Sequence, residues 1–284
     1  MSPVSSPPVS GPTGEPGRGG WSEDQELVAT LNEAADAVVR ALAELPDWGP
    51  AGARSGQYRS DLVADDAALA VLDGAGFGVL SEESGLHDPG RAMLVVVDPV
   101  DGSTNAARGL PFFATSLCAL DSSGPRAAVV LQLPAGPRYE AVRGGGARRD
   151  GRQIRPSACR DLSRAVVGVN GWPAQHLGWR QYRVLGSAAL ELCAVADGSL
   201  DGFVDLSRRG LAPWDYLGAL LVCTEAGARV GEGGGRELVV REASERRAVV
   251  AAGTDALLEG LLGGQRSIIR GRRHRPQGDH RGGV

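Results

Sequence analysis

The sequence predicts a globular protein of mixed α and β structure, with an antiparallel sheet in its first half and alternating strands and helices in its second. Three observations support this fold class. Apolar residues recur at helical spacing between 22 and 46, apolar runs separated by turn residues follow one another between 113 and 142, and strand and helix patterns alternate from about 159 onward. With 284 residues, the chain can bury a large core in one or two domains.

The N-terminal region is expected to contain a disordered tail and two helices. Residues 1–20 are rich in Pro, Ser and Gly and carry little apolar surface for a core. The spacing predicts an amphipathic helix over 22–46 and a second helix over 60–74. Asp65 and Asp66 lie near the start of the second helix, where acids favour its positive end. Alternatively, Asp66 lies close to a metal site.

The stretch 93–105 joins a valine-rich strand to a turn that contains two acids. Asp98 and Asp101 are close enough to share an ion across this turn, and the Val100 carbonyl is a third oxygen ligand of the kind that Mg²⁺ prefers. The Gly-Ser-Thr turn that follows has N–H groups for a phosphate. The alternative is a capped turn with solvated acids. An EF-hand is excluded, because its twelfth position would be Gly109 rather than Glu.

Two further acidic segments lie far from this stretch in the chain. A short strand over 77–85 ends at Glu82 and Glu83, and only one of two adjacent side chains on an extended chain faces a common site. A helix over 212–227 has Asp215 in its first turn, where the helix dipole stabilises a carboxylate. If Asp215 stood alone, helix capping would be enough to explain it. Because two other acidic segments occur in the chain, a metal-binding role for Asp215 becomes credible.

Composition excludes several kinds of chemistry. All 30 basic residues are arginine, so a Walker-A lysine, a Schiff-base lysine and a Ser-Lys dyad are ruled out. The net charge of −4 indicates no general attraction to nucleic acid or membrane. We expect a cytoplasmic protein, since no signal peptide or membrane-spanning run is recognised. Four scattered cysteines are expected to be buried free thiols: Cys118, Cys159, Cys193 and Cys223.

The remaining elements suggest two domains. Residues 21–158 form an N-terminal α+β domain that holds the metal-binding motifs, and 159–263 form a C-terminal α/β domain. Strands are predicted over 113–120, 126–133, 138–142, 166–169, 182–185, 200–206 and 248–252, and helices over 188–196 and 254–262. Residues 264–284 contain six arginines and one aspartate. This tail is expected to be disordered, with a weak nucleic-acid contact as the alternative.

Four motifs resemble those of the inositol monophosphatase family. They are Asp98-Pro-Val-Asp-Gly-Ser-Thr-Asn105, Ser81-Glu-Glu-Ser84, Gly186-Ser-Ala-Ala189, and Trp214-Asp215 with the helix to Glu225-Ala-Gly227. The resemblance covers about residues 22–263. It implies a layered αβαβα sandwich of the inositol monophosphatase and fructose-1,6-bisphosphatase type. Members of the family are Mg²⁺-dependent, lithium-sensitive phosphomonoesterases and are commonly dimers.

The resemblance also implies roles for individual residues. Two or three Mg²⁺ ions are expected, with Glu82, Asp98 and the Val100 carbonyl holding the first and Asp98, Asp101 and Asp215 the second. Ser103 stands where the family usually has threonine, and with Glu82 it is expected to orient the attacking water. Asp98 completes the expected catalytic set. The substrate is expected to meet Asp101, Gly102, Ser103, Gly186, Ser187, Asp205 and Asp215.

The expected substrate is a small phosphorylated alcohol, most simply an inositol monophosphate. Histidinol phosphate, 3′-phosphoadenosine 5′-phosphate and fructose 1,6-bisphosphate are alternatives within the family. A catalytically silent relative that binds a phosphorylated ligand is the alternative outside catalysis. Two departures concern the substrate end of the site: Asp205 replaces the more familiar glutamate, and Arg208-Arg209 is an unusual pair in a segment longer than the family's usual link.

Overall fold

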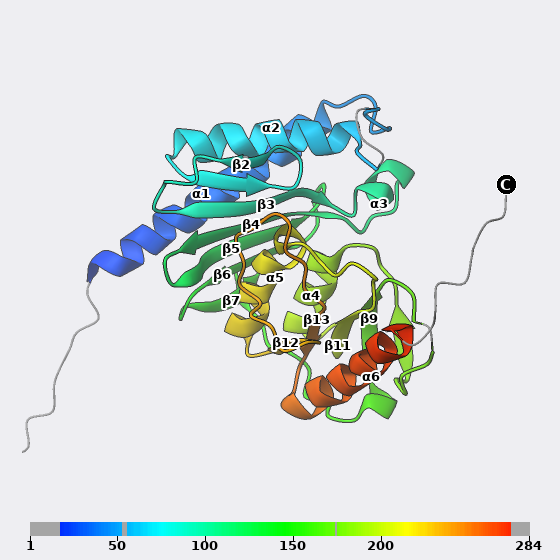
Figure 1. Cartoon of the computed structure of the whole chain (residues 1–284). Helices are drawn as coiled ribbons and strands as arrows, with labels where there is room; N and C mark the ends of the chain where they lie inside the picture. The colour runs from blue at the N-terminus through cyan, green and yellow to red at the C-terminus, as the bar shows by residue number, and fades with distance from the viewer. Residues whose placement is uncertain (1–17, 53–55, 174, 274–284) are drawn as a thin grey trace, which may run out of the picture.

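The protein is a five-layered sandwich of helices and sheets, as the resemblance implied. The computed structural model describes residues 18–52, 56–173 and 175–273. Figure 1 shows helices α1 and α2 at the top, a large sheet beneath them, α4 and α5 in the middle, a small sheet, and α6 at the bottom. The helices are α1 (Arg18–Ala43), α2 (Arg59–Gly74), α3 (Ser103–Arg108), α4 (Ala188–Ala196), α5 (Pro213–Ala226), α6 (Asp255–Arg273) and the short 3-10 helix Leu162–Arg164.

The two sheets differ in topology. The larger has eight strands in the order β2-β1-β3-β4-β5-β6-β7-β8, antiparallel except for the parallel pair β1 and β3. Its strands are β1 (Gly78–Ser81), β2 (Gly85–His87), β3 (Leu94–Asp101), β4 (Ala114–Asp121), β5 (Gly124–Gln132), β6 (Arg138–Val142), β7 (Gly146–Arg149) and β8 (Arg152–Gln153). The smaller has the order β10-β9-β11-β13-β12, formed by β9 (Val166–Asn170), β10 (Gln181–Arg183), β11 (Gly202–Asp205), β12 (Arg229–Glu232) and β13 (Val249–Ala252).

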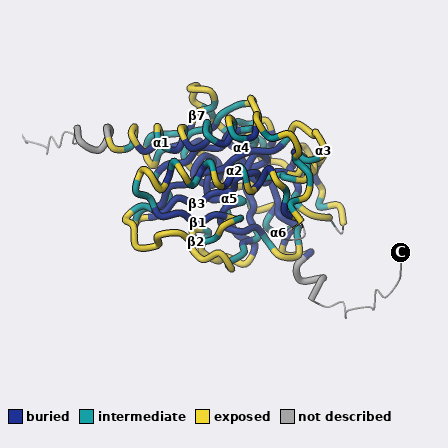
Figure 2. The backbone as a smooth tube through the Cα atoms, turned by 90° about the horizontal axis from the view of Figure 1, so that it is seen from above, coloured by how far each residue is buried: buried dark blue, intermediate teal, exposed yellow. Residues whose placement is uncertain are grey.

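The first half of strand β3, residues 94–97, is apolar because both faces of its sheet are covered. Val95 and Val97 pack into the cluster under α1 and α2, whereas Leu94 and Val96 pack into the cluster around α4 and α5. The alternation follows from the two-residue period of a strand. Figure 2 shows β3 and α5 in dark blue inside the molecule, with the exposed backbone at the periphery. The buried β3 therefore provides a rigid base for the acids at its carboxyl end.

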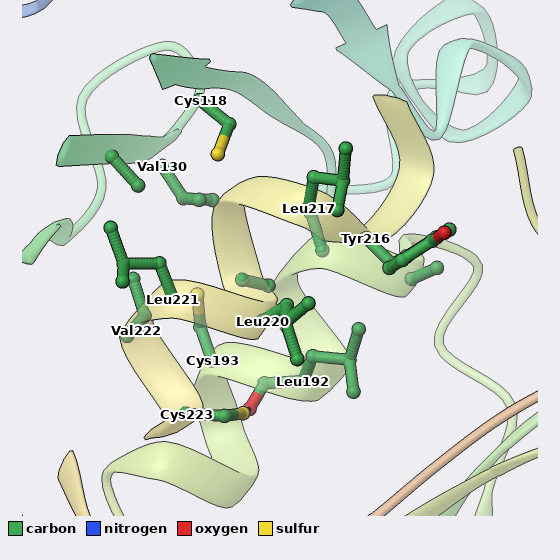
Figure 3. Packing of buried hydrophobic residues seen from close by; sticks show 14 of the residues in the cluster. Cys118, Val130, Leu192, Cys193, Tyr216, Leu217, Leu220, Leu221, Val222 and Cys223 are labelled. Carbon is green, nitrogen blue, oxygen red and sulfur yellow. Dashed lines mark hydrogen bonds between the residues drawn. The ribbon is translucent and has the colours of Figure 1, made fainter. Parts of the chain in front are cut away.

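Helix α5 is predominantly apolar because it lies between the two sheets. Leu220 and Cys223 lie beside Leu192 and Cys193 of α4, and Cys118 belongs to the large sheet above them (Figure 3). The four cysteines are free thiols, and Cys118, Cys193 and Cys223 are buried as expected, whereas Cys159 is only half-buried. No helix in the described ranges combines the length and apolarity needed to cross a membrane.

The last helix corrects the predicted start of the C-terminal tail. The sequence favoured a helix that ends at residue 262 and disorder from 264, but α6 continues to Arg273. Gln265 is fully buried and donates a hydrogen bond of 2.6 Å to the Asp205 carbonyl, and Ile268 is buried in the cluster beneath the small sheet. The adjacent glycines Gly263 and Gly264 weaken the sequence signal of the helix, and tertiary packing overrides this. Residues 1–17 and 274–284 lie outside the described ranges.

Ile268→Ala is expected to lower the free energy of unfolding by about 2–4 kcal/mol, because it deletes a buried side chain and leaves a cavity. Its exposed neighbour Ser267 provides the control, and Ser267→Ala should change stability by less than about 0.5 kcal/mol. Urea denaturation of both variants measures the difference. Equal, negligible effects would mean that the end of α6 is not packed on the sheet.

Candidate metal centre and active site

A β-bulge places two acids of β3 on the same side of the sheet. Residues 98 and 101 differ by an odd number, so regular alternation would direct their side chains to opposite faces. The register with β4 shifts here: Asp98 faces Ser116 and Asp101 faces Ala114, so three steps on β3 match two on β4. The extra residue falls at Pro99 or Val100, and Pro is tolerated in a sheet at such irregularities. Both carboxylates thereby face the middle layer.

Strand β1 brings Glu82 beside Asp98. The parallel pairing places Ser81 opposite Val97, and the Glu82 amide donates to the Val97 carbonyl at 3.2 Å. Glu82 is therefore the next residue along, level with Asp98 at the same end of the sheet. Glu82 is exposed as a residue, although its carboxyl group lies inward beside the other acids, whereas Asp98 is 1% exposed. The parallel pair thus places one acid at the mouth of the site and one at its floor.

Helix α5 supplies the third acid. Asp215 lies in its first turn and accepts a 2.8 Å hydrogen bond from the Ala212 amide, which fixes the side chain at the helix N-terminus. Single ligand atoms of Glu82, Asp98 and Asp215 lie within 4.8 Å of one another. Three segments that are widely separated in the sequence therefore converge on one point.

The electrostatics of this cluster fit a bound cation. Burial, followed by repulsion from Glu82, Asp101 and Asp215, raises the pKa of Asp98 well above its usual range. Burial and repulsion likewise raise the pKa of Glu82 to about 7 and hold that of Asp215 well above normal. Asp98 Oδ1 is buried and has no hydrogen-bond partner among the described residues. Since buried carboxylates need a partner, these oxygens match the preference of Mg²⁺ for hard oxygen ligands.

Asp101 is held from the other side by the N-terminus of α4. One of its oxygens accepts hydrogen bonds from the Ser187 hydroxyl at 2.6 Å and the Ala189 amide at 2.7 Å. Burial raises the pKa of Asp101 to about 6, although these hydrogen bonds oppose the shift. The second oxygen is left for another ligand. Asp101 is not part of the three-acid cluster, but it lies close enough to affect the pKa of all three members.

Two glycines allow the β3 turn and the α4 turn to touch. Gly102 has a φ of +93°, and a Cβ at this position would lie 2.8 Å from the Gly186 carbonyl oxygen. Gly186 has a φ of +86°, and its Cβ would lie 2.9 Å from Asn105 Nδ2. Asn105 in turn donates to the Leu185 carbonyl at 2.7 Å. Ser103 is the first residue of α3, directly after this contact, and is partly exposed.

A cavity of about 500 Å³ opens next to the acids. Its lining residues are Asp101, Asn170, Gly186, Ala188, Ser207, Arg208, Arg209, Gly210, Leu211 and Asp215. Asp101 and Asp215 thus belong both to the acidic region and to the cavity wall. The space is concave, and its wall combines apolar surface with a few charged and polar side chains, as small-molecule sites commonly do.

Two residues that were expected to contact the substrate, Ser187 and Asp205, lie behind the cavity wall. Ser187 is 1% exposed, and its hydroxyl is donated to Asp101. Asp205 is 2% exposed and accepts from Asn170 Nδ2 at 3.0 Å and from the Ser207 amide at 2.9 Å. These geometries favour a role in holding the loops that line the cavity, in place of the direct substrate contact that the resemblance suggested. Gly186 does line the cavity, as expected.

Sequence reasoning missed Asp61, and the alternative that placed Asp66 close to a metal site does not fit its exposed position. Asp61 is buried and interacts with Glu83, and burial raises its pKa to about 7. Asp65 lies on the same helix and faces the end of β1, where it accepts a 2.5 Å hydrogen bond from the Ser81 hydroxyl. Its neighbour Asp66 is exposed. Asp61 and Asp65 are four residues apart, so both lie on one face of the helix. This spacing is the sequence signal that could have identified Asp61.

A buried acid of α4 makes stability depend on pH. Glu191 accepts a 2.7 Å hydrogen bond from the Leu185 amide, and burial raises its pKa to about 8. A pKa above the unfolded value means that the folded state retains a proton that the unfolded state has lost. Glu191 therefore reduces stability as the pH rises from about 4.5 to 8, after which its effect is constant.

Glu191→Gln is expected to flatten this pH dependence, because glutamine keeps an acceptor for the Leu185 amide without an ionisable group. The melting temperature of the variant should exceed that of the unmodified protein increasingly from pH 5 to pH 8. Glu259→Gln, at an exposed position of α6, serves as the control and should run parallel to the unmodified protein. If the melting temperatures of both variants followed the same pH dependence as the unmodified protein, the assignment of this dependence to Glu191 would be contradicted.

Comparison with known proteins agrees with this geometry. Residues 74–270 match the model of the inositol monophosphatase family. A fructose-1,6-bisphosphatase/inositol-1-monophosphatase from Archaeoglobus fulgidus is 33% identical over 244 residues, which cover 81% of this chain and 94% of the relative. An inositol-1-monophosphatase from Mesorhizobium japonicum is 32% identical over a region that covers 83% of this chain and 93% of the relative. A solved structure from Pyrococcus horikoshii, described as similar to inositol-1 monophosphatase, has a TM-score of 0.74 at 26% identity and covers 86% of this chain and 98% of its own.

Proposed function

Because this chain belongs to the inositol monophosphatase family, we propose that it is a Mg²⁺-dependent phosphomonoesterase that hydrolyses a small phosphorylated alcohol. The observation that carries the proposal is the convergence of Glu82, Asp98 and Asp215, whose ligand atoms lie within 4.8 Å of one another. Such carboxylates are costly to keep together without a cation. Family membership makes the chain a phosphatase, and the acidic cluster is its metal-binding centre.

We assign two or three Mg²⁺ ions to this centre. Glu82, Asp98 and the Val100 carbonyl are the proposed ligands of the first, and Asp98, Asp101 and Asp215 are those of the second. The raised pKa values of the four acids support this, because cations would stabilise the charged forms that burial disfavours. When bound, the ions supply charge neutralisation and an activated nucleophile. Lithium is expected to inhibit.

The residues of the chain orient the reactants around these ions. The Gly102 and Ser103 amides, at the turn after β3, are proposed to bind the phosphate of the ester. The Ser103 hydroxyl and the Glu82 carboxylate orient the attacking water. Ser187 holds Asp101 in place through its hydrogen bond, so that the carboxylate keeps one orientation during the reaction. Ser103 in place of threonine retains the hydroxyl but has a freer χ1 rotamer.

The alcohol part of the substrate is proposed to occupy the cavity beside the acids. Its volume of about 500 Å³ suits a small polyol, and an inositol monophosphate is the first substrate to test. Relatives carry the names inositol-1-monophosphatase and fructose-1,6-bisphosphatase/inositol-1-monophosphatase, which makes sugar bisphosphates a natural second group. Histidinol phosphate and 3′-phosphoadenosine 5′-phosphate complete the panel.

Phosphate release from this panel, measured with Mg²⁺, with EDTA and with added Li⁺, tests the proposal. We expect hydrolysis of at least one small phosphomonoester that EDTA abolishes, that Mg²⁺ restores and that Li⁺ reduces. Release that is unaffected by EDTA would contradict the metal assignment. A lack of release from every member, together with binding of a phosphorylated ligand, would instead identify a catalytically silent relative.

We further propose that the enzyme acts as a homodimer in the cytoplasm. Exposed apolar side chains support a self-association surface: Trp172 is 81% exposed and Val184 is 58% exposed. Free thiols at all four cysteines fit a reducing compartment. Light scattering of the purified protein would measure the mass of the particle in solution. A monomer at micromolar concentration would contradict the proposed homodimer.

A further inference from the structure

The loop between β11 and α5 is anchored at both ends. The Ser207 amide donates to Asp205 Oδ1 at 2.9 Å, and the Gly210 amide donates to the Ser207 hydroxyl at 3.0 Å. Leu211 and Arg247 exchange two backbone hydrogen bonds of 2.8 Å. Gly210 has a φ of +79°, and a Cβ there would lie 3.0 Å from the Arg247 carbonyl oxygen. The turn is therefore held in one conformation against a neighbouring segment.

This fixed turn presents two adjacent arginines to the cavity. Arg208 and Arg209 both line it, together with Asp101 and Asp215. Both are exposed, and within the described part of the chain neither guanidinium has an ion pair or side-chain hydrogen bond. By contrast, Arg247, on the segment that anchors the turn, is buried and paired with Glu245. The cavity wall thus contains two carboxylates and two guanidinium groups that have no ion pair within the described residues. We call the part formed by Asp101 and Asp215 the carboxylate end and the part formed by Arg208 and Arg209 the arginine end.

The two ends suit two different parts of one substrate. The carboxylate end is the proposed metal centre and takes the ester phosphate. The arginine end is in the same cavity of about 500 Å³, so it faces the alcohol part of a bound substrate. Guanidinium groups bind phosphates and carboxylates through paired, charge-assisted hydrogen bonds. A neutral polyol would leave these charges without a partner.

We propose that Arg208 and Arg209 form a subsite for a second anionic group, so that the enzyme prefers phosphomonoesters whose alcohol part carries another phosphate or a carboxylate. This inference rests on the proposed function and specifies its substrate class. The arginines are specificity residues and lie away from the reacting phosphorus. Their effect should appear mainly in KM, since the second anion does not change charge during hydrolysis.

The double substitution Arg208→Gln and Arg209→Gln tests the subsite. Kinetics with Mg²⁺ are compared for fructose 1,6-bisphosphate, 2-phosphoglycerate and inositol 1-phosphate, which carry a second phosphate, a carboxylate and no second anion. We expect kcat/KM to fall about 10- to 100-fold for one or both of the first two substrates, as the loss of charged hydrogen bonds predicts, and less than about threefold for the third. The first two substrates distinguish phosphate from carboxylate.

A matched control removes the same charge elsewhere. Arg148→Gln with Arg152→Gln changes β7 and β8, at the opposite side of the large sheet from β1 and β3, and should alter none of the three rates by more than about twofold. An equal loss for all three substrates in the Arg208/Arg209 variant would indicate general electrostatic attraction and overturn the subsite. Unchanged rates for all three would overturn it as well.

Failure of the proposed function has a different signature. If the unmodified protein hydrolyses none of the three compounds, calorimetric titration in Ca²⁺ with the same compounds still tests the subsite. Tighter binding of fructose 1,6-bisphosphate or 2-phosphoglycerate than of inositol 1-phosphate, lost in the double variant, would support the subsite. Equal binding of the three would overturn it.

Discussion

Asp98→Asn abolishes phosphate release and removes the stabilisation by Mg²⁺ without unfolding the protein; this is the largest effect that we expect. Asp98 is central because it is buried beside both Glu82 and Asp215 and is the proposed ligand of both ions. Substitution of residues outside the metal's ligand shell already costs about 10- to 100-fold in affinity or activity. The loss of a shared carboxylate should therefore cost more than about 100-fold in metal affinity, with hydrolysis below detection.

The folding of the same variant should respond in the opposite direction. Burial and three neighbouring acids raise the pKa of Asp98, so a neutral amide relieves repulsion in the metal-free protein. Without metal we expect Asp98→Asn to melt at the same temperature as the unmodified protein or above it. With Mg²⁺ at about 100 times its dissociation constant, the unmodified protein gains about 2.7 kcal/mol and the variant gains almost none.

Asp66→Asn is the matched control, because Asp66 is an exposed acid halfway along α2. It should retain both activity and the response to Mg²⁺. Asp215→Asn should behave like Asp98→Asn, since it removes another member of the cluster. Hydrolysis at the unmodified rate by either cluster variant would show that the site has been wrongly assigned.

Gly102→Ala is expected to have the second-largest effect, because it separates two turns that touch. The backbone at Gly102 is left-handed, which costs an L-residue about 1–2 kcal/mol. The new methyl group would also lie 2.8 Å from the Gly186 carbonyl oxygen, so the backbone has to move. This movement displaces both Asp101 and the Ser103 amide, and a displacement of about 1 Å can cost about 100-fold in rate.

Gly109→Ala separates the two causes. Gly109 ends α3 with a φ of +71°, but a Cβ there meets nothing within 4 Å. This control should lose about 1–2 kcal/mol of stability from the backbone alone and keep its kcat. Chemical denaturation and phosphate-release kinetics of both variants provide the comparison. Equal effects on kcat would mean that contact between the turns is unimportant.

Much of the layered fold could be predicted, because its elements carry strong local signals. The valines of β3 and the apolar residues of α5 are buried on all sides, and their continuous hydrophobicity indicates this. The predicted strands over 166–169 and 248–252 and the helix over 188–196 agree with β9, β13 and α4 to within one residue. The short strands β2 and β12 were missed, since three or four residues give little periodicity.

The site was only partly predictable, because its assembly depends on contacts between distant segments. The motifs identified Glu82, Asp98 and Asp215, and the structure brings these three together. The bulge that turns Asp98 and Asp101 to one side is a property of pairing with β4, which no local pattern specifies. The burial of Ser187 and Asp205 and the participation of Asp61 likewise depend on packing across the middle layer.

The most direct test of the central claim is a crystal structure of the protein in Mn²⁺, in which anomalous scattering locates the metal. We expect a peak that is coordinated jointly by Glu82, Asp98 and Asp215, with metal–oxygen distances of about 2.0–2.2 Å. Carboxylates that point to separate patches of solvent, with no anomalous peak between β1, β3 and the start of α5, would contradict the account.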